Sequence, residues 1–304
     1  MKQLIKLISS IWLHPLNSSL VYRINALSRM VRWQLATRIL PESLHALPFV
    51  NGTLLMAERG AVGVTGNWYS GLDEPSEMAF TLHLLRRGDL FVDIGANVGS
   101  FTVLACSIEG VKAIAYEPIP ETASKLRRNI LVNDFEMVAE VRMLGVSDTP
   151  GTLRFTSSED SMNHVVGPEE TGVSASIEIE VVRLDDELVD LPAEQSLVMK
   201  IDVEGHEHAI IAGARKVLSR DMTRAVIMET NGSSLRYGVS DEALFSAMES
   251  LGFTPCIYNI ATRELSVISV ALPSHTNTIF IKTMADVRSK LKATAPIAIH
   301  SISV

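Results

Sequence analysis

The residues whose types and spacing could do chemistry begin with Asp-Ile-Gly-Ala-Asn-Val-Gly at 93–99. An apolar run ends at an acid, passes through glycines and continues as a second apolar run, which predicts a strand, a tight turn and a helix. Gly95 and Gly99 lack Cβ, so the turn can take positive φ and a ligand can lie against the backbone. The carboxylate of Asp93 can accept hydrogen bonds from a cationic or amine-bearing ligand. Together with Asn97, this turn predicts a nucleotide-type cofactor site.

The spacing of this turn separates it from two common nucleotide-binding motifs. Its pattern is Asp-x-Gly-x-Asn-x-Gly, whereas dinucleotide binders carry Gly-x-Gly-x-x-Gly and P-loops carry Gly-x-x-x-x-Gly-Lys-Ser/Thr. About twenty residues downstream a β-type run closes on Glu117, at the distance where α/β cofactor folds place a carboxylate on the ribose hydroxyls. Glu117 is therefore the predicted ribose ligand. The alternative is a strand-end acid that caps the helix starting near Pro120.

The densest cluster of titratable residues follows the apolar run 197–201. Four of its members lie within six positions and a further carboxylate ends the next apolar run: Asp202, Glu204, His206, Glu207 and Glu229. Ligands of open parallel α/β sheets bind beyond the carboxyl ends of the strands. This cluster is therefore expected to face the same crevice as Asp93 and Glu117.

Four segments together resemble one family. They are Val-Asp-Ile-Gly-Ala-Asn-Val-Gly at 92–99, Tyr-Glu-Pro at 116–118, Leu-Asp-Asp at 184–186 and Met-Lys-Ile-Asp-Val-Glu-Gly-His-Glu at 199–207. In these segments the chain resembles the FkbM-type S-adenosylmethionine-dependent methyltransferases, over roughly residues 72–283. The last segment is much more specific to that family than the glycine turn, which many methyltransferases share. The resemblance implies S-adenosylmethionine as the cofactor and O-methylation of an acceptor, often a sugar or polyketide hydroxyl.

Methyl transfer from a sulfonium requires the acceptor oxygen to lie in line with the methyl group, and one base to take its proton. The candidate bases are Asp202, His206 and Glu229. The imidazole of His206 suits the task because its unperturbed pKa is about 6.5, although an exposed position at a helix N-terminus is the alternative. Alternatively, the carboxylates of Asp202, Glu204 and Glu229 could together bind Mg²⁺. Helix capping explains Glu204 without a metal, so catalysis without Mg²⁺ is the prediction.

Two further cofactor candidates stand at the end of the expected third strand, 138–146. In this fold type the end of that strand lies near the adenine ring, which makes Ser147 and Asp148 candidates. Formation of a turn with the following Thr-Pro-Gly is the alternative explanation for both residues.

The candidates for contact with the acceptor stand in two expected loops. Trp68 and Tyr69 lie in the loop 66–71, where they could cover the cofactor, stack on a sugar ring, or pin the loop to the core. The polar segment 157–176 contains Asn163, and its length and polarity indicate an acceptor-facing loop. Glu204, after the fourth strand, is the remaining candidate.

Alternating β-type and helical segments predict the elements that position these side chains. The expected parallel strands are 90–94, 112–116, 138–146, 197–201 and 225–228, followed by β runs at 254–260, 264–269 and 278–282. Helices are expected at 75–86, 101–106, 121–132, 209–218 and 241–251. This order predicts a Rossmann-like class I methyltransferase fold of the α/β class. Its sheet would have seven mostly parallel strands with a terminal antiparallel hairpin, and helices on both faces.

Composition sets the limits of this prediction. A chain of 304 residues, 47% of them apolar, can form one large α/β domain with an appendage. The expected division is a basic helical extension at 1–45, a catalytic domain at 46–290 and a loose tail at 291–304. Cys106 and Cys256 stand in apolar runs, which indicates buried free thiols and a cytoplasmic location.

The N-terminal extension differs from the rest of the chain in charge. Its first 45 residues have a net charge of +5, whereas the whole chain has −8. Residues 1–13 lack a signal-peptide pattern, and the chain has no apolar run long enough to span a membrane. A helix over 20–39 would carry an apolar stripe at Leu20, Ile24, Leu27, Val31, Leu35 and Ile39. Packing on the catalytic domain or on a second subunit is the favoured interpretation, and contact of residues 1–40 with a membrane or other anionic surface is the alternative.

Three other functions compete with the methyltransferase prediction. A non-catalytic cofactor-binding or scaffold protein would fit better if Asp93, Glu117 or Asp202 had been replaced. An NAD-dependent oxidoreductase is disfavoured because the chain lacks the Gly-x-Gly-x-x-Gly turn of that class. A nucleic-acid methyltransferase is disfavoured by the acidic body and by the lack of an aromatic and basic surface. A glycan or small-molecule acceptor is therefore expected, and no nucleic-acid partner.

Overall fold

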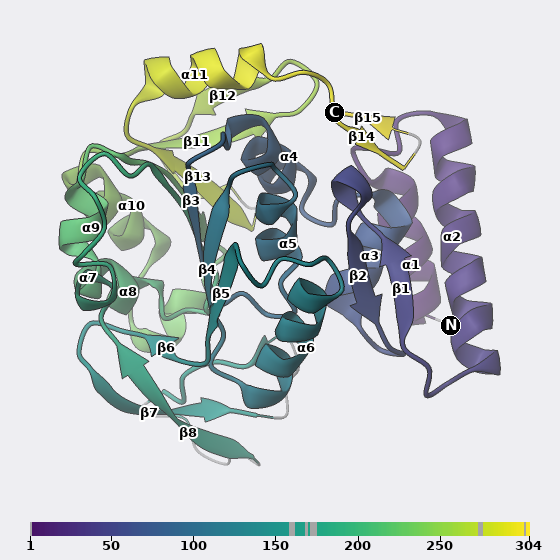
Figure 1. Ribbon diagram of the computed structural model, residues 1–304, viewed down its shortest axis with the longest axis horizontal. Coiled ribbons are helices and arrows are strands. Elements are labelled where there is room, and N and C mark those ends of the chain that lie inside the picture. Colours follow the sequence, from purple (N-terminus) through teal and green to yellow (C-terminus); the bar gives the residue numbers. More distant parts are fainter. Residues whose placement is uncertain (1, 158–161, 168–169, 171–174, 273–275, 301) are drawn as a thin grey trace.

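The structure is a computed structural model that describes residues 2–157, 162–167, 170, 175–272, 276–300 and 302–304. A central sheet lies between two layers of helices, and a separate group of N-terminal elements packs at one side (Figure 1). The predicted class I methyltransferase architecture is confirmed in this arrangement.

Within the described residues the central sheet has eight strands, one more than expected. Five are parallel: β3 (Leu90–Ile94), β4 (Lys112–Tyr116), β5 (Ala139–Arg142), β9 (Leu197–Ile201) and β10 (Thr223–Glu229). The others are β11 (Thr254–Asn259), β12 (Glu264–Val267) and β13 (Asn277–Ile281), in the overall order β12-β11-β13-β10-β9-β3-β4-β5. The β run expected at 264–269 forms the edge strand β12, which pairs with β11 and buries Leu265, so the expected total of seven strands is wrong by one.

Helices cover both faces of this sheet. On one face lie α4 (Pro75–Leu84), α5 (Ser100–Cys106), α6 (Pro120–Leu131) and α11 (Met284–Ala293). On the other lie α7 (Leu184–Glu187), α8 (Glu207–Gly213), α9 (Arg215–Ser219) and α10 (Asp241–Ser250). Each layer buries its own apolar core against the sheet, and Cys106 and Cys256 are buried free thiols.

The expected third strand, 138–146, is divided between two sheets. Its first part is β5, and its last two residues form β6 (Gly145–Val146) in a separate sheet. That sheet has the order β6-β8-β7, with β7 at Gly151–Thr156 and β8 at Ser176–Val182. Gly145 permits the change of sheet, because a Cβ there would lie 2.8 Å from Cγ1 of Val181.

The N-terminal elements form the second group. They are α1 (Lys2–Leu13), α2 (Leu20–Ile39), the hairpin β1 (His45–Pro48) and β2 (Leu54–Ala57), the 3-10 turn η1 (Val50–Gly52), and α3 (Val62–Ser70). The prediction of a loop at 66–71 is wrong, because residues 66–70 form the end of α3. Gly71 ends the helix by donating its N–H to the carbonyl of Asn67, at a φ of +97° that glycine tolerates.

The C-terminal segment, expected to be loose, packs against these elements. Its short strands β14 (Ala298–Ile299) and β15 (Ile302–Ser303) pair with each other, and the backbones of Ile297 and Val304 exchange two hydrogen bonds. Ile299 is fully buried and fills the space above Gly71. Apolar side chains in the tail therefore hold it in place, whereas the division of the chain at residues 45 and 290 stays a prediction.

The orientation of α2 differs from the favoured expectation. Its buried side chains are Ala26, Met30, Trp33 and Thr37. The expected apolar stripe lies on the opposite side, where Leu20, Ile24, Val31, Leu35 and Ile39 are exposed and only Leu27 is half-buried. The stripe therefore does not pack on the catalytic domain. No helix in the described part of the chain is both long and apolar enough to cross a membrane.

Candidate active site

A cavity of about 280 Å³ opens at the carboxyl ends of β3, β4 and β9. Its walls bring together side chains from the glycine turn, the ends of three strands, α3 and α4, and the small sheet. They include Asn67, Asp73, Glu74, Asp93, Asn97, Glu117, Phe155, Asn163, Lys200, Asp202 and Glu204. The cavity therefore joins half of the fourteen site residues that the sequence predicted.

The two glycines of the turn allow other parts of the chain to approach it. Gly95 has a φ of +80°, and a Cβ there would lie 1.8 Å from the backbone oxygen of Asp202. At Gly99, with a φ of +87°, a Cβ would collide with the side chain of Leu126 on α6. The glycines are thus required by close packing of β9 and α6, and they leave the backbone of Asn97 open to the cavity.

Glu117 is buried and its orientation is fixed by the backbone of the turn. One carboxylate oxygen accepts the N–H of Asn97 and the other accepts that of Ile119, both at 2.9 Å. Burial raises the pKa of Glu117 to about 7, although these two hydrogen bonds oppose the shift. Each oxygen keeps a free lone pair, so the carboxylate can hold the turn and also accept hydroxyl hydrogen bonds from a ligand in the cavity.

Asp93 is held beside a lysine that sequence reasoning missed. The strand register places Asp93 level with Lys200 on β9, and the Asp93 carboxylate accepts a hydrogen bond of 2.6 Å from the hydroxyl of Thr102. Burial raises the pKa of Asp93 to about 6, and the positive charge of Lys200 opposes this shift.

Lys200 lies at the centre of the acidic groups. Its ammonium group pairs with the Asp202 carboxylate, lies 3.8 Å from Oε1 of Glu74, and stands 4.6 Å from the ring centroid of Phe101. Burial lowers the pKa of Lys200, but Asp202 and Glu74 outweigh burial and raise the pKa above its ordinary value. The available sequence signal was a lysine inside an otherwise apolar strand, directly before the acidic cluster.

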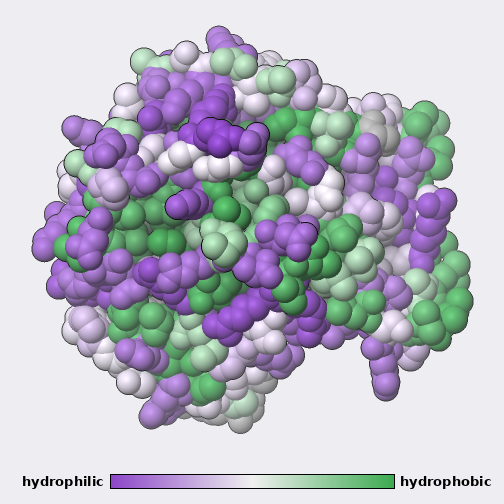
Figure 2. All heavy atoms as spheres, viewed as in Figure 1, coloured by the Kyte–Doolittle hydropathy of each residue, from purple (hydrophilic) through white to green (hydrophobic). Residues whose placement is uncertain are grey.

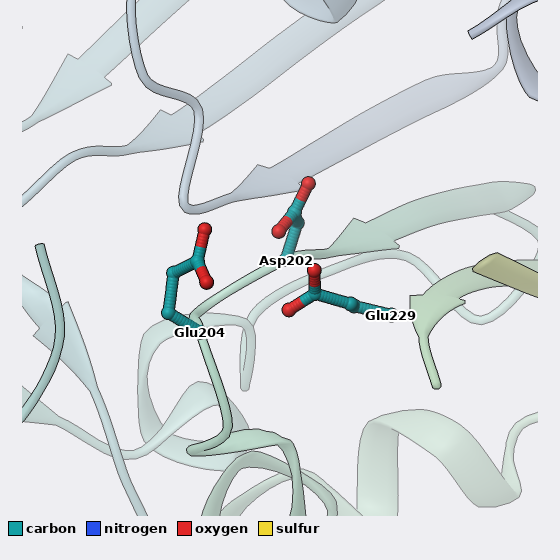
Figure 3. Close-up of side chains that lie close together, drawn as sticks. All are labelled: Asp202, Glu204 and Glu229. Atoms are coloured by element: carbon teal, nitrogen blue, oxygen red, sulfur yellow. The ribbon is translucent and has the colours of Figure 1, made fainter. Parts of the chain in front are cut away.

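Three carboxylates converge beyond β9 and β10. Oxygen atoms of Asp202, Glu204 and Glu229 lie within 4.8 Å of one another (Figure 3). Burial, and then the charge of Asp202, raise the pKa of Glu229 to about 9 and that of Glu204 to about 7. Glu229 lies just outside the cavity wall, where it accepts hydrogen bonds from Asn231 and Ser233. Three hard oxygen ligands at this separation could hold one divalent cation.

The walls of the cavity are strongly acidic. Six carboxylates line it, and Lys200 is the only basic side chain among the described lining residues. Burial also raises the pKa of Asp73 to about 6 and that of Glu74 to about 7. Buried acids without enough positive charge favour a ligand that brings its own positive charge.

His206 lies outside this cavity, although the sequence placed it among the candidate bases. It is the N-cap residue of α8, and its Nε2 lies 3.0 Å from the hydroxyl of Ser147, which in turn donates to Asp148. Burial lowers the pKa of His206 to about 4. His206, Ser147 and Asp148 thus lie together in the structure, but none of them lines the cavity.

The predicted acceptor contacts divide in the same way. Asn163 lines the cavity and accepts a hydrogen bond of 3.3 Å from Thr156, while residues 158–161 and most of 168–174 lie outside the described residues. Tyr69 is buried, with its hydroxyl bonded to Thr65 and Gln34. Trp68 packs edge-on against the ring of His300. Both aromatic residues join α3 to other parts of the chain, and neither lines the cavity.

The sequence resembles those of known methyltransferases. The model of the Methyltransferase FkbM domain matches residues 93–255. The 31-O-demethyl-FK506 methyltransferase FkbM of Streptomyces tacrolimicus is 28% identical over 159 residues, which cover 42% of this chain and 60% of that protein. The hexuronic acid methyltransferase AglP of Haloferax volcanii is 27% identical over 146 residues, which cover 48% of this chain and 58% of that protein. The chain thus spans about three fifths of the length of these relatives.

Solved structures with a similar arrangement include two methyltransferases. The precorrin-6y C5,15-methyltransferase of Geobacter metallireducens has a TM-score of 0.38 at 12% identity, covering 69% of this chain and 87% of that one. The S-adenosylmethionine-dependent O-methyltransferase of Thermotoga maritima has a TM-score of 0.35 at 13% identity, covering 69% and 64%.

Proposed function

Since the chain belongs to the FkbM methyltransferase family, we propose that it is an S-adenosylmethionine-dependent O-methyltransferase. Its proposed acceptor is a hydroxyl group of a sugar or of an oxygen-rich natural product. One relative is named for 31-O-demethyl-FK506 and the other for a hexuronic acid, and both names support an acceptor of this kind.

The observation that carries the proposal is the acidic cavity above the glycine turn. S-adenosylmethionine has a sulfonium and an ammonium group, and six carboxylates against one lysine complement such a cation. We assign Asp93, Asn97 and Glu117 to the cofactor, together with the backbone at Gly95 and Gly99. Ser147 and Asp148, which were also predicted to bind the cofactor, lie outside these walls.

When bound, S-adenosylmethionine supplies a methyl group made reactive by the positive sulfur. The protein then has to orient the acceptor hydroxyl and take its proton. Asp202 lines the cavity and has its orientation set by Lys200, so we assign proton removal to Asp202 and a positioning role to Lys200.

The other two candidate bases are less suited to this task. With a pKa of about 9, Glu229 is protonated at neutral pH and could donate, but not readily take, a proton. His206 is neutral at that pH, yet its ring is buried against Ser147 outside the cavity. Both are therefore secondary in this proposal.

A divalent cation is the alternative to direct proton transfer. Asp202, Glu204 and Glu229 could hold Mg²⁺ and orient two neighbouring hydroxyls. We propose catalysis without it, because Lys200 already neutralises Asp202. Turnover that is unchanged by a chelator supports this choice, whereas loss of turnover that added Mg²⁺ restores contradicts it.

The proposed activity is tested by mass spectrometry of acceptors incubated with the protein and S-adenosylmethionine. Hexuronic acid glycosides and hydroxylated polyketides form the acceptor panel, and Asp202→Asn is the inactive control. A methyl ether on a hydroxyl group supports the proposal. Methyl esters alone would contradict O-methylation of a hydroxyl, and no product at all from a protein that binds the cofactor would contradict the proposed acceptor class.

A further inference from the structure

The N-terminal helices expose far more apolar surface than the rest of the protein. Among the described residues, twelve of the twenty exposed large apolar side chains belong to the first 44 residues of the chain. On α1 they include Leu4, Ile5 and Ile8, and most of the others lie on α2. Such a concentration is unusual on a soluble surface and indicates a binding face.

On α2 these apolar side chains form a face of their own. Leu20, Ile24, Val31, Leu35 and Ile39 recur at intervals of four or seven residues, so they share one side of the helix. The opposite side of α2 packs on the protein. Figure 2 shows hydrophobic spheres, interrupted by hydrophilic ones, at the right-hand edge, where α2 lies in Figure 1.

The charged residues of this region are all of one sign. Lys6, Arg32 and Arg38 are exposed, and the sequence has no acidic residue before Glu42. Two further arginines serve the fold rather than the surface. Arg23 stands over the ring of Trp12 at 5.0 Å, and Arg29 donates to the carbonyl of Tyr69.

We propose that this basic apolar face, meaning the exposed apolar side chains of α1 and α2 with Lys6, Arg32 and Arg38, docks on an anionic lipid bilayer. Helices with an apolar face and basic polar residues lie in the bilayer interface, with the apolar side chains below the headgroups. The positive charges then lie at the level of the lipid phosphates. The acidic body of the protein is repelled by the same surface, which favours a single orientation.

A second copy of this chain fits the face less well. In a twofold symmetric contact the same patch occurs on both partners, so the basic side chains of both copies would lie in one interface. Residues 1–41 supply no carboxylate to separate these charges. An anionic bilayer supplies the missing negative charge, and a dimer does not.

The face is connected to the cavity through α3. Arg29 of α2 bonds the carbonyl of Tyr69 at the end of α3, and Asn67 of the same helix lines the cavity. A docked protein would thus hold its cavity at a fixed height above the lipid. The docking itself requires no cofactor, so the proposal stands or falls independently of the proposed function.

The test is co-sedimentation of the full chain with vesicles. One set holds roughly equal parts phosphatidylglycerol and phosphatidylcholine, and the other holds phosphatidylcholine alone. We expect binding to the anionic vesicles that falls at least roughly tenfold on neutral vesicles or at about 0.5 M salt. Equal binding to both vesicle types, or no binding to either, would overturn the proposal.

Two variants locate the binding face. Ile24→Asp combined with Leu35→Asp should reduce binding to anionic vesicles at least roughly tenfold, because two charges would enter the apolar interface. Val189→Asp, at an exposed apolar residue far from α1 and α2 in sequence, is the matched control and should bind like the wild type. Full binding by the double variant would refute this placement. The proposal would also be refuted if the protein did not bind vesicles and instead formed a concentration-dependent dimer, detected by light scattering, that the same two changes abolish.

Discussion

The cavity and the basic apolar face contrast in where they place their side chains. The cavity buries carboxylates, which ordinarily lie in water, and the face exposes leucines, isoleucines and valines, which ordinarily lie inside. Burying an acid raises its pKa, and exposing an apolar side chain forgoes its hydrophobic stabilisation. Both regions therefore hold groups that a ligand of complementary chemistry would stabilise. A cation suits the cavity, and an anionic apolar surface suits the face.

The first and largest expected effect concerns the chemistry of the cavity. Asp202→Asn should lower turnover by roughly 10²–10⁴-fold, the usual contribution of a general base. Affinity for S-adenosylhomocysteine should change little, because the amide keeps the shape of the side chain. Turnover and calorimetric titration together measure the two quantities. The exposed Asp190→Asn is the matched control, and a conservative His206→Gln should retain most of the turnover.

The second prediction concerns the stability of the protein without its cofactor. The folded-state pKa of Glu229 is about 9, well above its ordinary value. A raised acid pKa stabilises the fold at low pH, and this stability is lost as the pH rises from about 4.5 towards 9. Glutamine cannot ionise, so Glu229→Gln should be more stable than the wild type by about 4–5 kcal/mol at pH 8 and equally stable near pH 4. Urea unfolding at both pH values checks this, and a difference independent of pH would contradict it.

The third prediction concerns the pH dependence of cofactor binding. Burial raises the pKa of Asp93 to about 6 and those of Glu74 and Glu117 to about 7. A cationic ligand binds the ionised carboxylates, so affinity for S-adenosylmethionine should rise by roughly tenfold between pH 5.5 and 8. Binding should also release protons. Calorimetry in buffers of different ionisation enthalpy measures that release, and uptake of protons would contradict the account.

The smallest expected effect tests the basic apolar face. Ile39 is 75% exposed on α2, so Ile39→Ser should change the free energy of unfolding by less than about 0.5 kcal/mol. On the buried side of the same helix, Met30→Ala should cost about 2–5 kcal/mol. Denaturant unfolding of both variants measures the difference. A large loss for Ile39→Ser would mean that this face packs within the protein after all.

Sequence reasoning succeeded where the signal was local. The glycine turn at 95–99 and the acid Glu117 were identified by residue type and spacing, and the structure places both on the cavity. The alternation of β-type and helical segments along the chain also predicted most strands of the central sheet. Such features depend on neighbouring residues, so they can be read before the fold is known.

Features that depend on tertiary contacts could not be predicted from the sequence. Lys200 looked like part of a buried strand until the register placed it level with Asp93. On α2 both sides carry apolar residues, so the pattern could not show that Met30 and Trp33 face inward and Leu35 outward. Gly66 suggested a loop, although helix α3 tolerates it.

The central claim, that the acidic cavity binds the cofactor, is tested most directly by calorimetric titration with S-adenosylhomocysteine. The wild type is compared with Asp93→Ala and Glu117→Ala, and the exposed Glu249→Ala is the matched control. The account predicts binding by the wild type and the control that is lost or weakened at least roughly tenfold in both cavity variants. Absence of binding by the wild type, or equal binding by all four proteins, would contradict it.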